Sequence, residues 1–375
     1  MKTTKLLDVA DIIYGYAFDS KLFNTSGEGR PLIRIRDVNT GFSNTYTTEN
    51  APEKYLVRNG DFLIGMDGNF EIVKWTNGDA LLNQRVCKII PKSIKPDYLF
   101  YLLSPILKNI EDKAHSTTVK HLSAKELNKI SFELPNGDQQ SKIANELSNL
   151  HSMLELKREA LEGLDSLVKS RFMEMFGDVT VEQKNTIKLG SICKTMGGGT
   201  PTTKKPEYYE GNIPWISTVS LGPNYIDGSD AKGYITNDAI INSATKLIPA
   251  YSVMVGTRVG VGKSSVNTVP ICTNQDINSI TGLDSKKYIP LFIKYVVDAY
   301  QSYFDSIKKG ATILGINSDD LKNINVPNVS IDLQKEFVSF VEQIDKSRFI
   351  VQSQIKDLQE LLDSKMDEYF GGDEE

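Results

Sequence analysis

The sequence predicts an α+β protein of two homologous mixed α/β domains, joined by two long antiparallel coiled-coil helices in a pseudo-two-fold symmetric arrangement. Three observations predict this class. The chain repeats itself with a period of about 190 residues, far longer than that of a solenoid. Each copy opens with short apolar runs bounded by Gly, Asn and Pro, which is typical of short strands. Each copy ends in a heptad pattern, which is typical of a helix packed on another helix.

Matching residues of the two copies run along the whole chain. Their separation drifts from 183 residues to 191 and then 194, as loops of different length require. Solenoid repeats run roughly 20 to 50 residues, so this period indicates a duplicated domain. The clearest matches are "KLLDV" at 5–9 with "KLGSI" at 188–192, Gly65 with Gly256, Asn83-Gln84 with Asn274-Gln275, and Phe176-Gly177 with Phe370-Gly371.

The globular part of each copy is predicted to combine short strands with helices. Apolar residues recur at helical spacing in 97–112 and 288–307. Ser123 and Glu126 form a capping-box pattern for a further short helix, and "NSDDL" at 317–321 offers the same kind of start in the second copy. Strands are expected at Leu32–Ile35, Phe62–Ile64, Val86–Ile90, Val253–Val255 and Ile277–Ile280.

The heptad stripes predict a seam between two helices of about 36 residues, which gives a rod of about 54 Å. Every stripe position in one helix lies 194 residues from its counterpart in the other. Because related halves usually associate through a two-fold axis, the helices are expected to be antiparallel. The alternative is that each helix packs only on its own domain. The predicted seam residues are Ile143, Leu147, Leu150, Leu154, Leu161, Leu164 and Val168, and Phe337, Val341, Ile344, Val351, Ile355, Leu358 and Leu362.

The formal net charge of −5 is unevenly distributed along the chain. Residues 1–137 hold 18 Lys+Arg against 16 Asp+Glu, and residues 179–330 hold 15 against 12, so both stretches are mildly basic. Residues 138–178 hold 5 against 8 and residues 331–375 hold 5 against 12, so both heptad stretches are acidic. Mildly basic globular parts remain compatible with a nucleic-acid partner.

Composition argues against several other classes. No apolar run approaches the roughly 18 to 20 residues that span a bilayer, and no secretion segment opens the chain, so a cytoplasmic protein is expected. The three cysteines lie far apart and the three histidines lack metal-ligand spacing, so neither disulfides nor a metal site is predicted.

The most enzyme-like stretch is "VGTRVGVGKSS" at 255–265, a Gly-rich loop that ends in Gly-Lys-Ser. A phosphate-binding P-loop needs four residues between its first Gly and the Gly-Lys pair, whereas Gly256 and Gly262 enclose five, and no helical pattern follows. The sequence has no G-x-S-x-G hydrolase motif, no G-x-G-x-x-G dinucleotide-binding motif after a predicted strand and no H-E-x-x-H metalloprotease motif. We therefore expect no catalysis by this chain and no cofactor bound to it.

Polar and basic loop residues are the candidates for contacts with DNA. In "RPLIRIRDV" at 30–38, Arg34 and Arg36 are expected on the same side of a strand, where both could face a groove. Ordinary surface positions are the alternative for all of these candidates. Trp75 and Trp215 are expected in the cores. The candidates are Ser20, Lys21, Arg34, Arg36, Lys74 and Lys120 in the first copy, and Thr200, Lys204, Lys205, Ser217, Arg258, Lys263, Lys308 and Lys309 in the second.

Several motifs, in an order that occurs twice, resemble the specificity (S) subunits of type I restriction-modification enzymes. "GGTPTTKKPEYYEGNIPWIS" at 198–217 is similar to a common opening of a target recognition domain. "LP...QQSKIANEL" and "VP...LQKEFVSFV" resemble the family's entries to its long helices, and "FGD" at 176–178 and "FGG" at 370–372 resemble its helix ends. The first copy departs from the pattern, because "YGYAFDSKLFN" at 14–24 stands where the second has the GGTP loop.

The resemblance implies a non-catalytic subunit whose two target recognition domains each read one half of a bipartite double-stranded DNA sequence, while the helices set the spacer. It also implies two modification subunits, which bind S-adenosylmethionine and methylate adenine, and restriction subunits that translocate and cleave. The expected domains are 1–137 and 179–330 for target recognition, 138–178 and 331–372 for the spacer helices, and 373–375 for an acidic tail. The alternative is a duplicated protein-interaction scaffold with ligands other than DNA.

Overall fold

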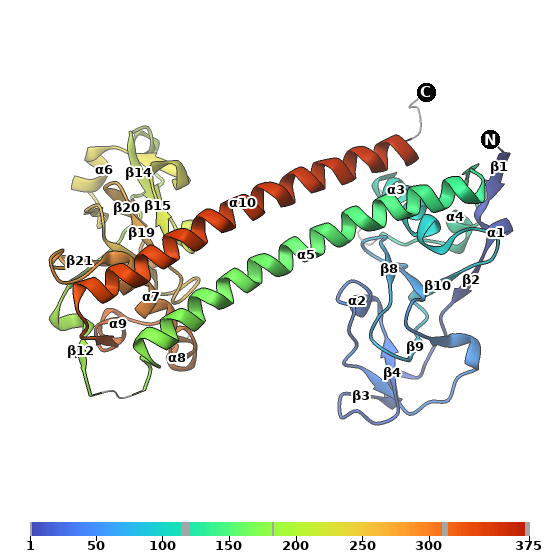
Figure 1. The fold of residues 1–375 in the computed structure, drawn as a ribbon, viewed down its shortest axis with the longest axis horizontal. Coiled ribbons are helices and arrows are strands. Elements are labelled where there is room, and N and C mark those ends of the chain that lie inside the picture. Colours follow the sequence, from blue (N-terminus) through green and yellow to red (C-terminus); the bar gives the residue numbers. More distant parts are fainter. Residues whose placement is uncertain (1, 114–119, 182–183, 310–313, 372–375) are drawn as a thin grey trace. The chain divides into compact units, whose positions relative to one another are not determined.

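The computed structural model describes residues 2–113, 120–181, 184–309 and 314–371 (Figure 1). The chain divides into two compact units, one formed by Met1–Glu159 with Gln352–Glu375 and the other by Ala160–Val351. Each unit therefore contains one globular domain together with a part of both long helices. The predicted acidic tail, 373–375, lies outside the described residues.

The first unit holds a two-stranded sheet, a four-stranded antiparallel sheet in the order β2-β10-β7-β8, and a five-stranded sheet in the order β3-β5-β4-β9-β6. Its strands are β1 Lys2–Lys5, β2 Ala10–Tyr14, β3 Phe23–Asn24, β4 Arg30–Ile33, β5 Tyr46–Thr47, β6 Leu56–Val57, β7 Phe62–Gly65, β8 Ile72–Lys74, β9 Ala80–Leu82, β10 Val86–Pro91 and β11 Ser131–Leu134. Its helices are α1 Leu6–Val9, α2 Ile35–Val38, α3 Pro96–Lys113, α4 Ala124–Leu127 and the start of α5, Gly137–Phe176.

The second unit repeats this plan with a two-stranded sheet, a sheet in the order β13-β21-β18-β19-β15, and a sheet in the order β16-β14-β20-β17. Its strands are β12 Thr186–Lys188, β13 Lys194–Gly197, β14 Ile213–Ile216, β15 Tyr225–Ile226, β16 Gly233–Ile235, β17 Leu247–Ile248, β18 Val253–Gly256, β19 Ser264–Asn267, β20 Ile271–Thr273, β21 Ile277–Thr281 and β22 Asn325–Pro327. Its helices are α6 Asn237–Ile241, α7 Pro290–Ala299, α8 Gln301–Ile307, α9 Ser318–Lys322 and the start of α10, Ile331–Phe370.

Strand pairing confirms the duplication that the sequence predicts. The parallel pair β4–β9 of the first unit has its counterpart in the parallel pair β14–β20 of the second. The antiparallel pair β10–β7 corresponds in the same way to β21–β18. Both domains therefore combine strands and helices on one plan, as the predicted mixed α/β class requires.

The predicted elements appear with two differences. The expected strand Leu32–Ile35 ends at Ile33, because Ile35 already begins α2. The expected helix 288–307 is divided into α7 and α8 at Tyr300, whose ψ of 7° departs from helical geometry. The Tyr300 hydroxyl donates a hydrogen bond to the Val179 carbonyl and accepts one from the Asn325 amide. These bonds tie the break to two other segments of the domain, which a helical pattern alone does not reveal.

Equivalent buried glutamines fix the starts of the two long helices. Gln140 accepts a hydrogen bond from the Lys95 amide at 2.9 Å and donates to the Pro135 carbonyl at 2.8 Å. Gln334, which is fully buried, accepts from the Ile289 amide at 3.0 Å and donates to the Lys287 carbonyl at 2.8 Å. Each amide side chain thereby satisfies a buried backbone donor and acceptor at the point where helix and domain meet.

The long helices α5 and α10 pack together in antiparallel orientation, as predicted. In the second unit Arg348 pairs with Asp165 at 2.5 Å, and Arg171 pairs with Glu336 at 2.8 Å, so residue numbers rise along α5 as they fall along α10. In the first unit the Tyr369 hydroxyl donates to Glu146 at 2.7 Å. No described helix is long and apolar enough to cross a membrane.

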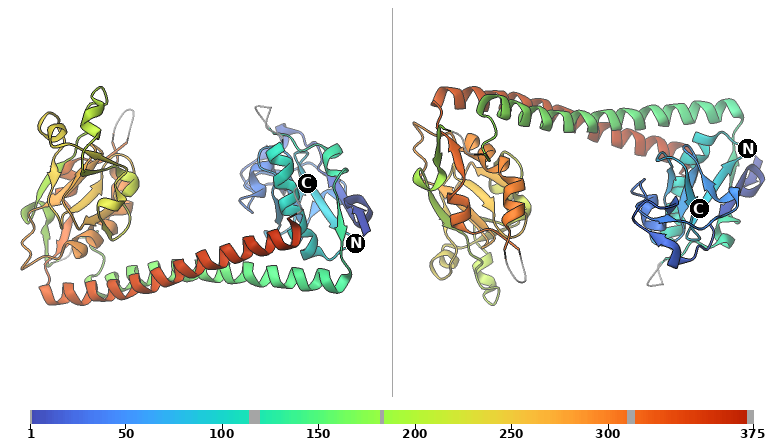
Figure 2. Two further views of the ribbon diagram at one scale, coloured as in Figure 1. Left: turned by 90° about the horizontal axis from the view of Figure 1, so that it is seen from above. Right: turned by 90° about the horizontal axis from the view of Figure 1, so that it is seen from below.

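Burial along these helices follows the heptad pattern. The predicted seam residues are buried or partly buried, whereas Leu156 is 64% exposed and Phe349 is 73% exposed. The helix ends also pack into the globular cores (Figure 2). Phe172 and Phe176 of α5 contact Phe337 in the core of the second unit. Packing on a domain and packing between helices therefore coexist, although the sequence pattern presented them as alternatives.

Candidate nucleic-acid interface

A tight turn occupies the same place in each domain, directly before a central strand. In the first unit the Val86 amide donates to the Asn83 carbonyl at 2.9 Å, and in the second the Ile277 amide donates to the Asn274 carbonyl at 3.3 Å. The asparagine is buried in both turns. Gln84 and Gln275 follow it, and Gln84 is exposed. The loops that form each candidate surface lie beside these turns.

The segment that departs from the family pattern occupies the same backbone position as its counterpart. Gly15 and Gly198 each lie so close to the turn that a Cβ atom would come within 2.0 Å and 2.2 Å of the Asn83 and Asn274 carbonyl oxygens. The amides of Tyr16 and Gly199 then donate to the carbonyls of Leu82 and Thr273. "YGYAF" and "GGGTP" thus share one path, and the side chains that they carry make the difference between them.

The GGTP loop of the second unit is held against its turn. Thr200 donates a hydrogen bond to the Gln275 side chain. The Trp215 indole donates to the Gly199 carbonyl at 3.1 Å, and the Tyr209 hydroxyl donates to the Pro201 carbonyl at 2.6 Å. Trp215 is partly buried and packs against a small core cluster that includes Tyr208 and Ile235, whereas Trp75 is 1% exposed.

Two predicted lysines of this loop, Lys204 and Lys205, are exposed. The Lys205 ammonium lies 5.0 Å from the ring centroid of Tyr208 and donates to its hydroxyl at 3.1 Å. In the first unit, Ser20 and Lys21 are likewise exposed in the turn Ser20–Leu22, which Asp19 caps. Ser217 is partly buried at the start of the turn Thr218–Ser220.

Arg34 and Arg36 do not lie on one strand face, so this prediction is wrong. The chain leaves β4 after Ile33, and the Arg34 amide donates to the Asp37 carboxylate at 2.9 Å as α2 begins. Arg34 lies over the ring of Phe23, with 5.8 Å to the centroid. Arg36 is exposed and donates to Thr45 at 3.1 Å. Asp37 provides a helix-starting acceptor, which overrides the β propensity of the apolar run.

Three other predicted cations are paired with carboxylates. Lys74 lies 3.4 Å from Asp97, Lys120 lies 3.1 Å from the buried Glu111, and Lys308 pairs with Asp305. The hydrogen bond from Lys120, together with the Phe70 amide, outweighs burial and holds the pKa of Glu111 below its usual value. Lys120 therefore neutralises a buried charge, which favours a structural role for it.

The Gly-rich loop after β18 is a tight connection to a strand. The Gly262 amide donates to the Gly256 carbonyl at 2.9 Å, and β19 follows directly. Arg258 and Lys263 are exposed on this loop, and Lys309 is exposed on the neighbouring bridge to Gly315. A nucleotide-binding P-loop requires a helix at this point, so the geometry agrees with the sequence in rejecting one.

The described residues also offer little for catalysis or metal binding. Within them no three His, Cys, Asp or Glu side chains gather where they could hold a metal ion. Burial raises the pKa of the Cys87 thiol to about 12 and those of Cys193 and Cys272 to about 11. At neutral pH these thiols are protonated, and the thiolate is the nucleophilic form.

The family model of the type I restriction modification DNA specificity domain matches residues 1–165 and 181–360. The chain belongs to this family. Its duplicated domains and paired helices are thus those of a type I specificity subunit, the non-catalytic component that determines DNA specificity in a restriction-modification complex with other subunits. This membership decides for DNA recognition over the alternative of a scaffold with other ligands.

Two specificity subunits from Escherichia coli are similar to this one. The EcoBI specificity subunit is 29% identical over 370 residues, which cover 90% of this chain and 77% of that protein. The EcoR124I/EcoR124II specificity subunit is 33% identical over 167 residues, which cover 42% of this chain and 40% of that protein.

Two solved structures share the fold of this specificity subunit. The S subunit from M. genitalium aligns with a TM-score of 0.55 and 15% identity, covering 97% of this chain and 94% of that one. A chain from a structure of type I system assembly and conformational transition aligns with a TM-score of 0.60 and 16% identity, covering 98% and 97%.

Sequence reasoning missed one group of polar residues beside the turns. In the first unit Arg85 pairs with Asp67, and His121 Nδ1 lies 2.6 Å from the same carboxylate. Burial opposes ionisation of Asp67, but the hydrogen bonds from His121 and Arg85 outweigh it and lower its pKa. At the equivalent positions of the second unit, the pair is Arg258 with Asp276. A reversal of charge at a spacing of 191 was the signal available in the sequence.

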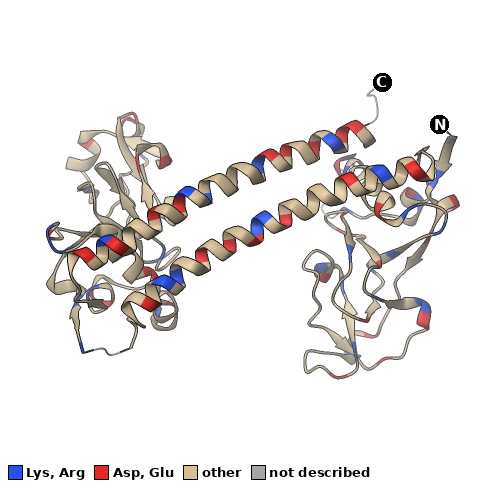
Figure 3. Ribbon diagram, viewed as in Figure 1, with Lys and Arg blue, Asp and Glu red and all other residues tan. Residues whose placement is uncertain are grey.

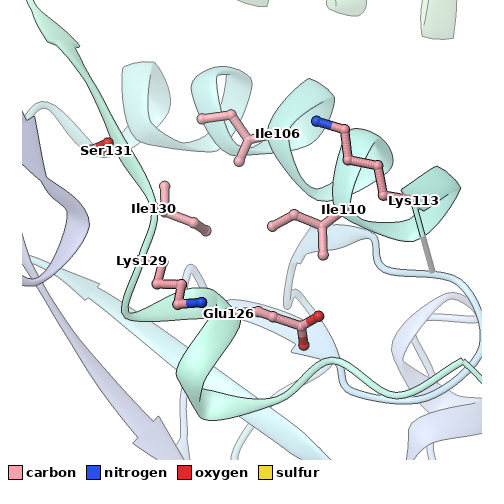
Figure 4. Close-up of a pocket in the computed structure, with 7 residues that line it drawn as sticks. All are labelled: Ile106, Ile110, Lys113, Glu126, Lys129, Ile130 and Ser131. Carbon is pink, nitrogen blue, oxygen red and sulfur yellow. The ribbon is translucent and has the colours of Figure 1, made fainter.

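The first unit of the specificity subunit also has an apolar pocket of about 400 Å³ between α3 and the start of β11 (Figure 4). The side chains of Ile106, Ile110 and Ile130 point into it, and Lys113 lies at its rim. Among the described residues that line it, Glu126 carries the one carboxylate, which caps α4. In the second unit Tyr300 stands 194 residues after Ile106, and its hydroxyl bonds the Val179 carbonyl and the Asn325 amide. The two copies therefore carry different side chains at this place.

Proposed function

We propose that each globular domain of this chain reads one half of a bipartite DNA sequence, and that α5 and α10 set the spacer between the halves. The observation that carries this proposal is that the two domains share the backbone of their turns and loops but differ in the side chains that these loops carry. Both domains place an Asn-Gln turn beside a glycine-bounded loop, but Tyr16 stands where Gly199 does and Arg34 where Ser217 does. Two recognition domains with the same backbone and different contact residues suit a DNA target whose two halves differ in sequence.

We propose further that α5 and α10 dock two modification subunits, which supply S-adenosylmethionine and methylate adenine in the cytoplasm, and that restriction subunits join this complex. Acidic residues recur along both helices (Figure 3). Exposed apolar side chains accompany them, such as Leu156 and Met153 on α5 and Phe349 and Ile350 on α10. Apolar residues surrounded by charges are typical of a surface that a partner protein covers.

Mapping of methylated adenines in cells tests the two-reader proposal. Cells with this chain should methylate one bipartite motif that cells without it do not. Replacing Arg34 and Arg36 by alanine should relax or abolish one half of the motif, and replacing Arg258 and Lys263 should affect the other half. Lys287, which is 72% exposed near the start of α10, supplies a control lysine whose removal should change neither half. Equal loss of both halves from either pair of substitutions contradicts two separate readers.

A further inference from the structure

The two domains carry the same ion pair with its charges exchanged. In the first unit Arg85, which follows the Asn-Gln turn, donates to Asp67 on the loop after β7. In the second unit Asp276 follows the Asn-Gln turn, and Arg258 on the loop after β18 lies 4.0 Å from it. Both exchanged positions are separated by 191 residues, the spacing that also relates the turns themselves.

The backbone around the pair is the same in both units. The Met66 amide donates to the Arg85 carbonyl at 3.0 Å, and the Thr257 amide donates to the Asp276 carbonyl at 2.7 Å. A third segment closes each site, because Leu122 donates to the Met66 carbonyl and Ile316 donates to the Thr257 carbonyl, both at 2.8 Å. The exchange therefore takes place on one shared backbone arrangement, with the cation after the turn in the first unit and on the loop after β18 in the second, and the carboxylate in the opposite place.

Each arginine is presented to solvent while its aspartate is largely enclosed. The side chain of Arg85 is 56% exposed and that of Asp67 is 14% exposed. For Arg258 and Asp276 the values are 55% and 16%. A guanidinium has five N–H donors in a planar fork, and one carboxylate can occupy only part of them. In each arginine the donors that the carboxylate does not take remain available to a ligand.

The third segment differs between the units in a way that suits the exchange. His121 binds the free oxygen of Asp67 in the first unit. Its counterpart at a spacing of 194 is Gly315, where a Cβ atom would lie 2.5 Å from the Thr257 carbonyl oxygen and 3.3 Å from Arg258 Cγ. Histidine thus bonds the aspartate in the first unit, whereas glycine in the second lets the third segment lie close to the backbone of Thr257 and Arg258.

We propose that Arg85 and Arg258 contact DNA, one from each unit, and that the exchange of the pair helps the two domains to read different half-sites. This inference rests on the proposed function and adds a residue, Arg85, to its contact surface. The ligand is a pair of hydrogen-bond acceptors on DNA, which either a guanine edge or a phosphate supplies. Because the cation projects from the turn in one unit and from the opposite loop in the other, the same frame offers its donors at two different places.

The first test is Arg85→Ala in the complex assembled with its partner subunits. Binding is measured on duplexes that carry the methylated motif, with libraries randomised in one half-site at a time. We expect affinity to fall about 10- to 100-fold, as for loss of a bidentate contact, with the base preference of the first half-site relaxed and that of the second unchanged. Lys92→Ala is the control, since Lys92 lies beyond the far end of β10 in an exposed pair with Asp11.

The second test is the triple substitution Asp67→Arg, Arg85→Asp and His121→Gly, which gives the first unit the residues of the second at all three positions. The ion pair is kept, so the melting temperature should stay close to that of the unchanged complex, while the base preference of the first half-site changes. A reversed pair that leaves both affinity and preference unchanged shows that the pair is structural only, and overturns the inference.

The source of the acceptors decides the remaining outcomes. A loss confined to sequences with a particular base pair assigns a base contact and supports the inference. A uniform loss across sequences, with a salt dependence smaller by about one phosphate contact, assigns a phosphate and overturns the role in specificity. If the unchanged complex binds no duplex, the proposed function fails and takes the inference with it; normal binding with no effect of Arg85→Ala overturns the inference alone.

Discussion

Single side chains decide how the long helices meet the domains. Gln140 and Gln334 each satisfy a backbone amide and a backbone carbonyl that lie just outside the helix. Neither was a candidate at the level of sequence, because a glutamine in the first turn of a helix is unremarkable until its partners are known. Lys95 and Ile289, which supply the amides, are 45 residues away in both cases. Such a contact depends on the tertiary fold and leaves no local signal.

Gln334→Ala is predicted to lower the free energy of unfolding by about 1 to 3 kcal/mol, because it leaves a buried donor and a buried acceptor without partners. Urea unfolding of the purified chain, followed by circular dichroism, measures the change. Gln343→Ala is the matched control, since Gln343 is exposed on the same helix, and it should change stability by less than about 0.5 kcal/mol. Equal effects of the two substitutions would show that the hydrogen bonds of Gln334 do not stabilise the start of α10.

Candidate contact residues were predictable by type but not by environment. Lys74, Lys120 and Lys308 were chosen as loop cations, and the structure pairs each with a carboxylate. Arg85 was overlooked, although its loop was recognised through Asn83 and Gln84. Residue type indicates which side chains can bind DNA, whereas the aspartate that orients one of them becomes visible only when distant loops are brought together.

At the scale of elements, long periodic patterns were predicted well and short strands poorly. The heptads gave both long helices, whose observed spans are Gly137–Phe176 and Ile331–Phe370. Two-residue strands such as Tyr46–Thr47 and Leu56–Val57 were not predicted, because two residues are too few to show an alternation of apolar and polar side chains. Their pairing comes from the neighbouring strands β4 and β9, which provide the backbone partners.

The heptad register gives a prediction for two leucines that lie two residues apart on α5. Leu154 is 1% exposed and Leu156 is 64% exposed. Leu154→Ala should lower the free energy of unfolding by about 2 to 5 kcal/mol, because it removes buried apolar volume, and Leu156→Ala should change it by no more than about 0.5 kcal/mol. Denaturant unfolding of the two variants compares them directly. Similar losses at both positions would be inconsistent with the observed register.

At the scale of the whole molecule, the duplication was the most informative feature of the sequence. Matching residues at 183, 191 and 194 already implied one fold used twice, and the paired sheets repeat accordingly. The sequence could not show that the unit boundaries fall inside the long helices, at Glu159 and Val351. That boundary depends on which domain each helix end packs against, and a uniform heptad pattern does not indicate this.

The spacer role predicts the effect of lengthening both helices. One heptad is inserted between Glu159 and Ala160 and another between Val351 and Gln352, which keeps both seams in register. Seven residues add about 10.5 Å of helix, so the spacer of the methylated motif should grow by about 3 base pairs. Methylation mapping reads the new motif. A heptad inserted in one helix alone should disrupt the pairing of the helices and abolish methylation. An unchanged spacer in the double insertion would contradict the proposal that the helices set the spacer.

The division of the units has a topological consequence. The first unit contains both ends of the chain, Met1–Glu159 and Gln352–Glu375, and the second is continuous. Two connections therefore run between the units, one in α5 and one in α10. A cut in α10 leaves the two globular domains covalently joined through α5, whereas a cut in α5 leaves the first domain attached only by the packing of the last part of α10 on it. Limited digestion that cuts α5 alone should accordingly give a nicked molecule that migrates as one species on a native gel and as two fragments under denaturing conditions.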